Sequence, residues 1–390
     1  MKIPEKFDPI RPYNDDEVKQ AFYGLIEDRQ FSRLVKGYLP WVPKSMRGGA
    51  LKLMFKMSGV KTLLDFQKRF MKPIVEALVK RAMTSIEFGG RPAPSVQGRY
   101  TFVSNHRDIV LDSALLDVLL VNNGHDTTVE IAIGDNLLIY PWIEKLVRLN
   151  KAFIVRRSLS PREMYKSSQL MSEYIHFAVN EKRENIWIAQ REGRAKDSSD
   201  NTQPSVLKML AMGGGEGVSA VDSLKHLNIV PLTISYEYDP CDYLKAKEFQ
   251  LRRDNPTYKK TRQDDLENMK TGIMGFKGRV VYECAPCINK WLDELQGLPS
   301  GEFFNEVARR MDIDIHAGYR LFPGNYIAVD ILDGTRAHSA HYTAADEVKF
   351  DKYVRGQIAK IDIPNRDDDF LRERILTMYA NPVRNKEQGA

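Results

Sequence analysis

The chain has few cysteines, and their small number excludes two kinds of protein. Its 390 residues include only Cys241, Cys284 and Cys287, which are too few for the disulfide framework of a small secreted domain. Cys284 and Cys287 form a Cys-x-x-Cys pair, but the second pair that would complete a zinc site is missing. We therefore expect a protein of a reducing, cytoplasmic compartment.

Segments that would carry the chain across a membrane are also missing. The N-terminal stretch MKIPEKFDPIRPYNDDE has no apolar run behind its basic residues, so it does not form a signal peptide. The most apolar stretch, Ile109 to Val121, contains Asp112 and Asp117 and is shorter than the roughly 18 apolar residues of a spanning helix. The sequence therefore predicts a protein that is neither exported nor membrane-spanning.

Charge of one sign is not strongly in excess. Lysine and arginine number 58 against 52 acidic residues, which gives a net charge of +6. This bias favours anionic surfaces in general, whether lipid headgroups, an acidic protein or nucleic acid. The sequence has no zinc-finger or helix-turn-helix signature, and its basic residues alternate with Met, Leu and Phe at helical spacing. We therefore expect no nucleic-acid partner.

A basic amphipathic segment runs from Lys44 to Arg81. It contains ten Lys or Arg residues against two acids. Apolar residues recur in it at helical spacing: Leu63, Phe66, Phe70, Ile74 and Leu78. Three glycines and one proline are expected to divide it into two or three helices: Gly48, Gly49, Gly59 and Pro73. The helices lie in the headgroup layer of a membrane, or they form a hairpin packed on its own domain with a solvated basic face.

After Gly90 the pattern changes to short apolar strands that alternate with helices. The expected strands are 99–104, 128–133, 152–155, 186–189, 229–235 and 277–284, and the expected helices are 109–121, 141–149 and 161–182. Ser160 and Glu163 form a capping box at the start of the longest helix. This alternation predicts an α/β fold with a mostly parallel sheet flanked by helices.

Three regions follow from these patterns. Residues 1–90 form an N-terminal helical, membrane-associating region, residues 91–300 an α/β domain, and residues 301–390 a C-terminal helical extension. Within the α/β domain, the polar stretch from Tyr238 to Lys270 is interpreted as an insertion over the core or a flexible arm. The last twenty residues are rich in Arg, Asp and Asn and are expected to fray.

A histidine stands where the first predicted strand ends. The strand 99–104 leads directly into NHRD, which contains His106, and active sites gather at such strand ends. Asp112 follows about one helical turn later, so it can hold the imidazole tautomer of His106 and stabilise the imidazolium. Asp108, in a His-x-Asp arrangement, is an alternative partner. The pattern predicts a general base, with a capping or surface pair as the competing interpretation.

Two further segments place cations directly after strands. They are NKAFIVRR, from residue 150, and QREGRAK, from residue 190. Their cations after the strands are Arg156, Arg157, Arg191, Arg194 and Lys196. Parallel strands bring such loops to one edge of a sheet, so we expect the cations to converge near His106 as a cradle for a phosphate-bearing acceptor. Alternatively, half of them, Arg157 and Lys196 included, only solvate the surface.

In this order the segments resemble the four sequence blocks of the glycerolipid acyltransferase family, over about Thr101 to Glu237. SNHRDIVLD resembles the first block, NKAFIVRR the second, QREGRAKD the third, and IVPLTISYE, which contains Pro231, the fourth. The stretches GDNLLIYPWIEKLVRL and KGRVVYECAPCI resemble flanking parts of the family, with Ala285 where the family has Gly. The NHRDIVLD wording leans toward the glycerol-3-phosphate-acyltransferase-like branch.

The resemblance implies an O-acyltransferase of phospholipid biosynthesis. It implies acyl-CoA or an acyl carrier protein as donor, and glycerol-3-phosphate or a related lysophospholipid as acceptor, with no metal and no cofactor. It assigns catalysis to His106 and its carboxylate partner. It assigns substrate binding to Arg156, Arg157, Glu192, Gly193, Arg194 and Pro231. A lipid acceptor or product, together with the basic segment, implies a peripheral protein on the cytoplasmic face of the membrane.

The first block departs from the family's spacing. His106 and Asp112 are separated by five residues, where the family has four. Either a local bulge absorbs the extra residue or Asp108 is the partner of His106, and we favour Asp112.

The third block is one residue short. Gly193 is followed directly by Arg194, so an alignment on the arginine leaves Glu192 off the family's glutamate, and its role stays open. The two altered spacings keep two other functions in view. One is an acyltransferase for a different lipid acceptor, such as an amino-lipid or another lysolipid, and the other is a lipid-binding scaffold that has lost activity.

Overall fold

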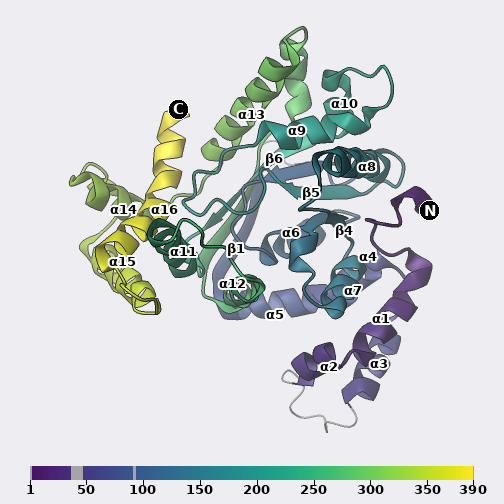
Figure 1. Cartoon of the computed structure of the whole chain (residues 1–390), viewed down its shortest axis with the longest axis horizontal. Coiled ribbons are helices and arrows are strands. Elements are labelled where there is room, and N and C mark those ends of the chain that lie inside the picture. The colour runs from purple at the N-terminus through teal and green to yellow at the C-terminus, as the bar shows by residue number, and fades with distance from the viewer. Residues whose placement is uncertain (1, 37–46, 91–93, 390) are drawn as a thin grey trace.

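A seven-stranded sheet forms the centre of the molecule (Figure 1). The computed structural model describes residues 2–36, 47–90 and 94–389. The strands are β1 (Met83–Gly90), β2 (Thr101–Ser104), β3 (Val129–Gly134), β4 (Ala152–Val155), β5 (Asn185–Ala189), β6 (Ile229–Tyr236) and β7 (Gly278–Cys284). Their order is β1-β7-β6-β2-β5-β3-β4, and neighbouring strands are parallel except β6 with β7. The predicted mostly parallel sheet is confirmed.

One strand of the sheet was not predicted from the sequence. β1 lies within residues 1–90, which were expected to be helical, and it pairs in parallel with β7 at the edge of the sheet. Most of its residues are only half-buried. The alternation of Ile86 and Phe88 is short and is followed at once by Gly89 and Gly90, so the local pattern is also typical of the end of a helix.

Helices cover both faces of the sheet (Figure 1). One face carries α8 (Pro161–Asn180), α9 (Pro204–Ala211), α10 (Ala220–His226) and α13 (Ser300–Ala317), and the other carries α5 (Lys72–Ala82), α6 (Leu111–Asn122) and α7 (Pro141–Leu149). Adjacent residues of β2 show how this arises: Phe102 packs in the α5–α6 layer and Val103 in the α8–α13 layer. Both are fully buried, as in a sheet covered on two sides.

The C-terminal part of the chain forms a separate helical cluster beside the sheet. α11 (Asp242–Asp254), α14 (Pro323–Asp333), α15 (Ala344–Ile358) and α16 (Asp368–Gln388) share an apolar core, whereas α12 (Arg262–Met274) lies near α5 (Figure 1). The structure decides two expectations here. Of the two interpretations of the stretch from Tyr238 to Lys270, the flexible arm is wrong, because the stretch forms α11 and much of α12. The expected fraying of the C-terminus is also wrong. The last twenty residues belong mainly to α16, in which Ile375 and Tyr379 are buried.

Buried, paired polar groups explain why the polar composition of this stretch wrongly suggested a flexible arm. Asp242 on α11 is fully buried, yet it accepts hydrogen bonds from Tyr353, Tyr379 and Gln357 at 2.5–2.9 Å. Lys245, also buried, forms an ion pair with Asp239 at 2.5 Å. Polar side chains enter a core when each finds a partner. A polar stretch therefore does not by itself indicate an exposed one.

The N-terminal helices extend away from the body of the protein (Figure 1). The helices that do so are α1 (Val18–Glu27), α2 (Arg29–Lys36) and α3 (Arg47–Ser58). α4 (Leu63–Asp65) and a π-helical turn, η3 (Phe66–Met71), lie against the body and lead into α5. Residues 44–46 of the basic segment lie outside the described residues. Of the expected helix breakers only Gly59, with φ +68°, follows the end of a helix. Gly48 and Gly49 lie inside α3, and Pro73 is tolerated in the first turn of α5.

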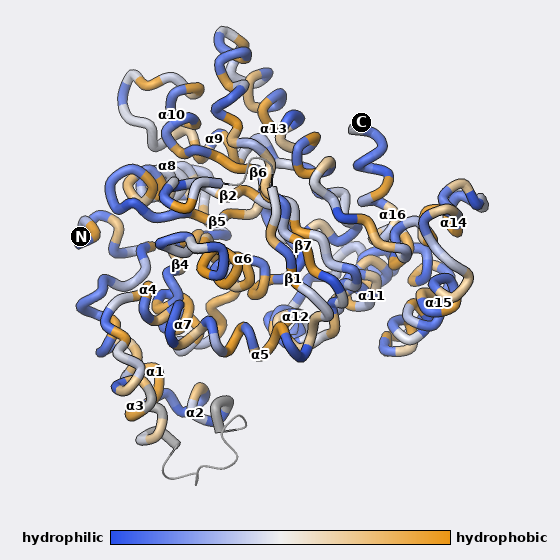
Figure 2. The backbone as a smooth tube through the Cα atoms, turned by 180° about the vertical axis from the view of Figure 1, so that it is seen from behind, coloured by the Kyte–Doolittle hydropathy of each residue, from blue (hydrophilic) through white to orange (hydrophobic). Residues whose placement is uncertain are grey.

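The basic segment packs partly on its own domain and leaves some apolar side chains exposed. Phe55 and Phe66 are buried with Phe22, and the rings of Phe22 and Phe55 stack at 3.9 Å, so part of the segment packs on its own domain. Leu53 and Met57 are exposed by 57% and 77%. Seen from behind, apolar and polar positions alternate along α5 (Figure 2). In the part of the chain that the structure describes, no helix has both the length and the apolar character needed to cross a membrane.

Candidate active site

The loop that carries His106 is held from both neighbouring strands. β2 ends at Ser104, which is in register with Ala189 of β5 and Leu232 of β6. Asn105 continues the contact with β6, because its side chain accepts from Ile234 N at 2.7 Å and donates to Ile234 O at 3.0 Å. The backbone next to His106 is therefore fixed at the carboxyl edge of the parallel strands, which is where the sequence predicted this histidine.

His106 forms a hydrogen bond with Asp112 at the start of α6. The distance from His106 Nδ1 to Asp112 Oδ2 is 2.8 Å, and the histidine side chain is 13% exposed while that of Asp112 is fully buried. Asp112 Oδ2 also accepts the backbone N–H groups of Arg107, at 2.6 Å, and Asp108, at 3.0 Å. The chain turns around this carboxylate, and that turn absorbs the extra residue between His106 and Asp112.

The side chain of Asp108 binds the backbone of α6 and does not bind His106. Its Oδ1 accepts from Val110 N at 2.9 Å and Leu111 N at 2.8 Å, so it caps the first turn of α6. Burial raises the pKa of Asp108 above its ordinary value, although nearby Lys277 opposes the shift. Of the two carboxylates that the sequence left open, the structure brings Asp112 to His106.

Two aromatic side chains that the sequence did not single out complete the His106 environment. Tyr236, from β6, donates its hydroxyl to Asp112 Oδ1 at 2.8 Å. Trp187, from β5, packs its ring edge-on to His106 with 5.5 Å between ring centroids. Both lie on strands beside β2, so the order of the strands in the sheet brings them to the site.

Arg107, next to His106, is buried against a loop far away in the sequence. Its guanidinium pairs with Asp200 at 2.6 Å and donates to Ser198 Oγ at 2.8 Å. Asp200 also accepts from Tyr319 Oη at 2.6 Å. Burial alone would lower the pKa of Arg107, but Asp200 keeps it above its ordinary value. No local pattern in the sequence indicates this pair, because Asp200 lies 93 residues away from Arg107.

The predicted cations occupy three different environments. Arg156 is exposed at the end of β4. Arg157 reaches the third-block loop, where it pairs with Glu192 at 3.4 Å, so Glu192 acts as a link between two blocks. Lys196 turns to α11 and pairs with Glu248 at 2.5 Å. The structure therefore joins the loops but does not bring all five cations to one point.

The third-block loop holds buried donors without acceptors. Among the described residues, eight buried side-chain polar atoms have no hydrogen-bond partner, and three of them lie within this loop: Gln190 Nε2, Arg191 Nε and Arg194 Nη1. Gln190 N donates to Ser104 O at 2.8 Å, so the loop begins directly beside the His106 loop. Gly193, with φ +69°, makes the turn. Unpaired buried donors are costly in a folded protein, so these three atoms are candidates to bind an acceptor.

Two further sequence features lie inside the sheet. Pro231 is buried on β6 in register with Val103, three residues before His106. Cys284 is buried at the end of β7, and burial raises the pKa of its thiol above the ordinary range. Within the described ranges, no group of three or more His, Cys, Asp or Glu side chains is arranged to hold a metal ion.

Residues 85–235 match the family model described as Acyltransferase. This match covers β1 to β6 and includes His106, Asp112 and the third-block loop. It agrees with the resemblance of the four blocks, and this part of the chain is similar to an acyltransferase domain.

Comparison with whole proteins adds little detail. No curated protein sequence matches the chain. Among solved structures, the chain is similar to the crystal structure of the 1-acyl-sn-glycerophosphate (LPA) acyltransferase PlsC from Thermotoga maritima. The two share 13% sequence identity with a TM-score of 0.36, over 75% of this chain and 92% of that chain.

Proposed function

We propose that the protein transfers a fatty acyl group from a thioester, acyl-CoA or acyl carrier protein, to a hydroxyl of glycerol-3-phosphate or a related lysophospholipid. The observation that carries this proposal is the His106–Asp112 pair, set at the carboxyl edge of the sheet beside a loop of unsatisfied cationic and amide donors. The histidine supplies base chemistry and the loop suits a phosphate.

In the proposed mechanism, His106 acts as the general base. Asp112 holds Nδ1, so Nε2 is the nitrogen that accepts the hydroxyl proton while the hydroxyl oxygen attacks the thioester carbonyl. The tetrahedral intermediate collapses with loss of the thiolate, which takes the same proton from His106. Backbone N–H groups near Gly193 are the candidates to stabilise the oxyanion. No covalent acyl-enzyme forms, because no serine or cysteine nucleophile takes part.

The acceptor phosphate is assigned to the arginines of the second and third blocks. Arg194 is the central one: burial alone would lower its pKa, but Cys241, Asp239 and Asp108 keep the pKa above the ordinary value. Its Nη1 is buried without a partner among the described residues. Arg156, exposed at the end of β4, adds a second cation at the rim. Holding the acceptor in this way supplies proximity to the thioester carbon.

The membrane is the proposed location, on its cytoplasmic face. The exposed Leu53, Met57 and Ile74 lie on helices that also carry lysines. Such a surface can enter the headgroup boundary while its cations interact with anionic lipids. A peripheral attachment of this kind would bring the enzyme to a lipid acceptor or product.

Release of free thiol from acyl-CoA tests this function directly. Release should depend on glycerol-3-phosphate or lysophosphatidate, and His106→Ala should reduce it by about 10²- to 10⁴-fold because the base is lost. The folded state of the variant is checked by its thermal midpoint. Release that depends only on an amino-lipid or another lysolipid would identify a different acceptor. If no acceptor supports release, the protein is a lipid-binding scaffold without acyltransferase activity.

Asp112→Asn and Asp108→Asn separate the two carboxylates. Asp112→Asn should lose most of the turnover at an unchanged thermal midpoint, since it disturbs the imidazole tautomer. Asp108→Asn should act mainly on stability, because Asp108 caps α6. The reverse pattern would assign the orienting role to Asp108.

A further inference from the structure

Helix α12 lies outside the family match and touches the third-block loop with one polar side chain. Asn268 Oδ1 accepts a hydrogen bond from Arg194 Nη2 at 2.8 Å. The other end of the amide is also engaged, because Asn268 Nδ2 donates to Asp264 O at 2.8 Å. Asn268 is buried, and its amide orientation follows from these two bonds. The guanidinium of Arg194 therefore rests against a fixed acceptor.

The helix that carries Asn268 is anchored at the active-site loop. At Gly272, an added Cβ would lie 2.3 Å from Asp108 Oδ2, so only glycine allows α12 to come this close. The buried Lys277 donates to Gly272 O, and to Gly275 O at 3.0 Å. A cation on the last carbonyls of a helix is favourable. Asn268 is thus held in place relative to the first-block loop as well as to Arg194.

These contacts leave Arg194 with one nitrogen engaged and one unpaired. Nη2 is bound to Asn268, whereas Nη1 is buried with no partner among the described residues. An uncharged amide can orient the guanidinium and leave its charge in place, whereas a carboxylate would neutralise that charge. The arrangement preserves both the direction and the positive charge of Arg194.

We propose that Asn268 is a positioning residue for the acceptor: by holding Nη2 of Arg194, it aims Nη1 at the phosphate and so sets the preference for phosphate-bearing acceptors. This inference rests on the proposed role of Arg194 in phosphate binding. It adds to the acyltransferase domain a specificity element from a helix beyond residue 235.

Steady-state kinetics of thiol release with glycerol-3-phosphate test the inference. Asn268→Ala should raise the KM for the acceptor about tenfold, the usual effect of losing a hydrogen bond to a charged group, and should leave the KM for acyl-CoA unchanged. Asn268→Asp keeps the shape of the side chain but neutralises Arg194, so it should raise the acceptor KM further. Gln263→Ala, an exposed position on the same helix, is the matched control and should change neither constant.

A double-mutant cycle separates this inference from the proposed function. On an Arg194→Ala background, Asn268→Ala should have no further effect on the acceptor KM, because the guanidinium that Asn268 orients is gone. If Arg194→Ala raises the acceptor KM but Asn268→Ala does not, or lowers it, the positioning role is overturned while the phosphate site stands. If Arg194→Ala itself leaves the acceptor KM unchanged, the phosphate assignment fails and the positioning role fails with it. Thermal midpoints identify any variant that does not fold.

Discussion

The N-terminal and C-terminal helices both flank the same sheet, but they differ in what they contact. The N-terminal helices bury Phe22, Phe55 and Phe66 in a cluster shared with α7 and leave Leu53 and Met57 exposed. Polar side chains of the C-terminal helix α16 donate hydrogen bonds to the loop 197–200, which contains the partner of Arg107. The N-terminal helices thus expose apolar side chains, whereas α16, whose last residues were expected to fray, contacts a loop near His106.

α16 contacts the loop 197–200 through side-chain amides that donate hydrogen bonds to backbone carbonyls of the loop. Asn381 Nδ2 donates to Asp197 O at 2.7 Å, and Asn385 Nδ2 donates to Ser198 O at 3.2 Å and Ser199 O at 3.1 Å. The same loop carries Asp200, the partner of Arg107. A chain of contacts therefore runs from the last helix to the residue beside His106.

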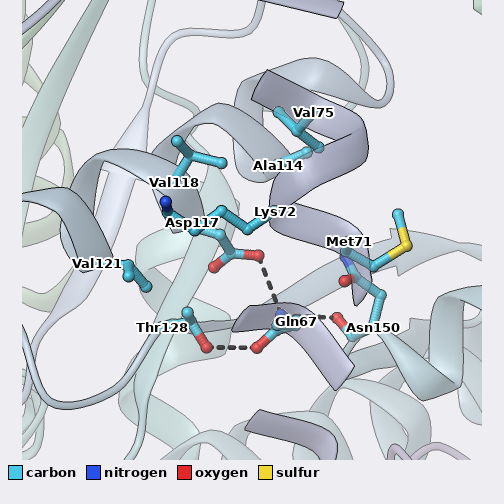
Figure 3. Close-up of a pocket in the computed structure, with 10 residues that line it drawn as sticks. All are labelled: Gln67, Met71, Lys72, Val75, Ala114, Asp117, Val118, Val121, Thr128 and Asn150. Atoms are coloured by element: carbon cyan, nitrogen blue, oxygen red, sulfur yellow. Dashed lines mark hydrogen bonds between the residues drawn. The ribbon is translucent and has the colours of Figure 1, made fainter. Parts of the chain in front are cut away.

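The contact of the N-terminal helices with the sheet layer is centred on Gln67 (Figure 3). Gln67 Nε2 donates to Asp117 Oδ2 at 3.0 Å and to Asn150 O at 3.1 Å, and Thr128 donates its hydroxyl to Gln67 Oε1. Asp117 lies on α6, further along the helix than Asp112. Burial raises the pKa of Asp117 to about 7. The network joins the N-terminal helices to the core through Asp117 and Thr128.

The largest expected effect is at Asp200, where the inward contact reaches Arg107. Asp200→Ala leaves a buried guanidinium unpaired, which should cost about 3–5 kcal/mol of unfolding free energy and abolish thiol release. Urea unfolding and the release assay measure both. Glu27→Ala removes the exposed partner of Lys52 in the N-terminal region and is the matched control, which should leave the urea midpoint and turnover unchanged. Equal effects of the two variants would remove the distinction between the regions.

A smaller effect is expected when the amides of α16 are removed. The double variant Asn381→Ala/Asn385→Ala frees the loop 197–200, and small displacements of a catalytic group reduce turnover about 10- to 100-fold. The thermal midpoint should fall only slightly, because the apolar core of α16 is untouched. A kcat equal to that of the wild type would show that the loop keeps its position without α16.

The pH dependence of stability tests two buried carboxylates, Asp117 of α6, which accepts a hydrogen bond from Gln67, and Asp242 of the C-terminal cluster. Burial raises the pKa of Asp117 and of Asp242 to about 7, against about 3.9 in the unfolded chain. Between these values the folded state holds protons that the unfolded state has released, so stability falls as pH rises toward 7 and is level above it. Asp117→Asn and Asp242→Asn should each flatten the fall of the thermal midpoint between pH 5 and 8. A fall as steep as that of the wild type in both variants would contradict these pKa shifts.

The smallest effect on chemistry is expected in the outward-facing region. Replacing five lysines of the basic segment by glutamine should weaken sedimentation with anionic vesicles and reduce its salt dependence, since each cation contributes about 1 kcal/mol near such a surface: Lys52, Lys56, Lys61, Lys68 and Lys72. Thiol release with a soluble, short-chain donor should stay near the wild-type rate. The control replaces exposed lysines of the C-terminal region, Lys349, Lys352 and Lys360, and should leave vesicle binding intact. Unchanged binding in the first variant would place the membrane contact elsewhere.

The sequence alone predicted much of the sheet and the centre of the site. Strands β2 to β7 lie within a few residues of their expected ranges, because buried parallel strands are short apolar runs between turn signals. The same local order of strand, loop and helix predicted His106 at a strand end with Asp112 nearby. Each of these features depends on residues close together in the chain, where periodicity and spacing are informative.

Only the tertiary structure decided between the two carboxylates and revealed what supports the site. Asp112 binds His106 because the intervening chain turns around its carboxylate. Tyr236 and Asp200 reach the site from positions 124 and 93 residues away from their partners. α16, expected to fray, packs through buried apolar residues. Pairing between distant polar groups leaves no local periodicity, since each residue alone has the composition of a solvated surface, and only the fold brings the partners together.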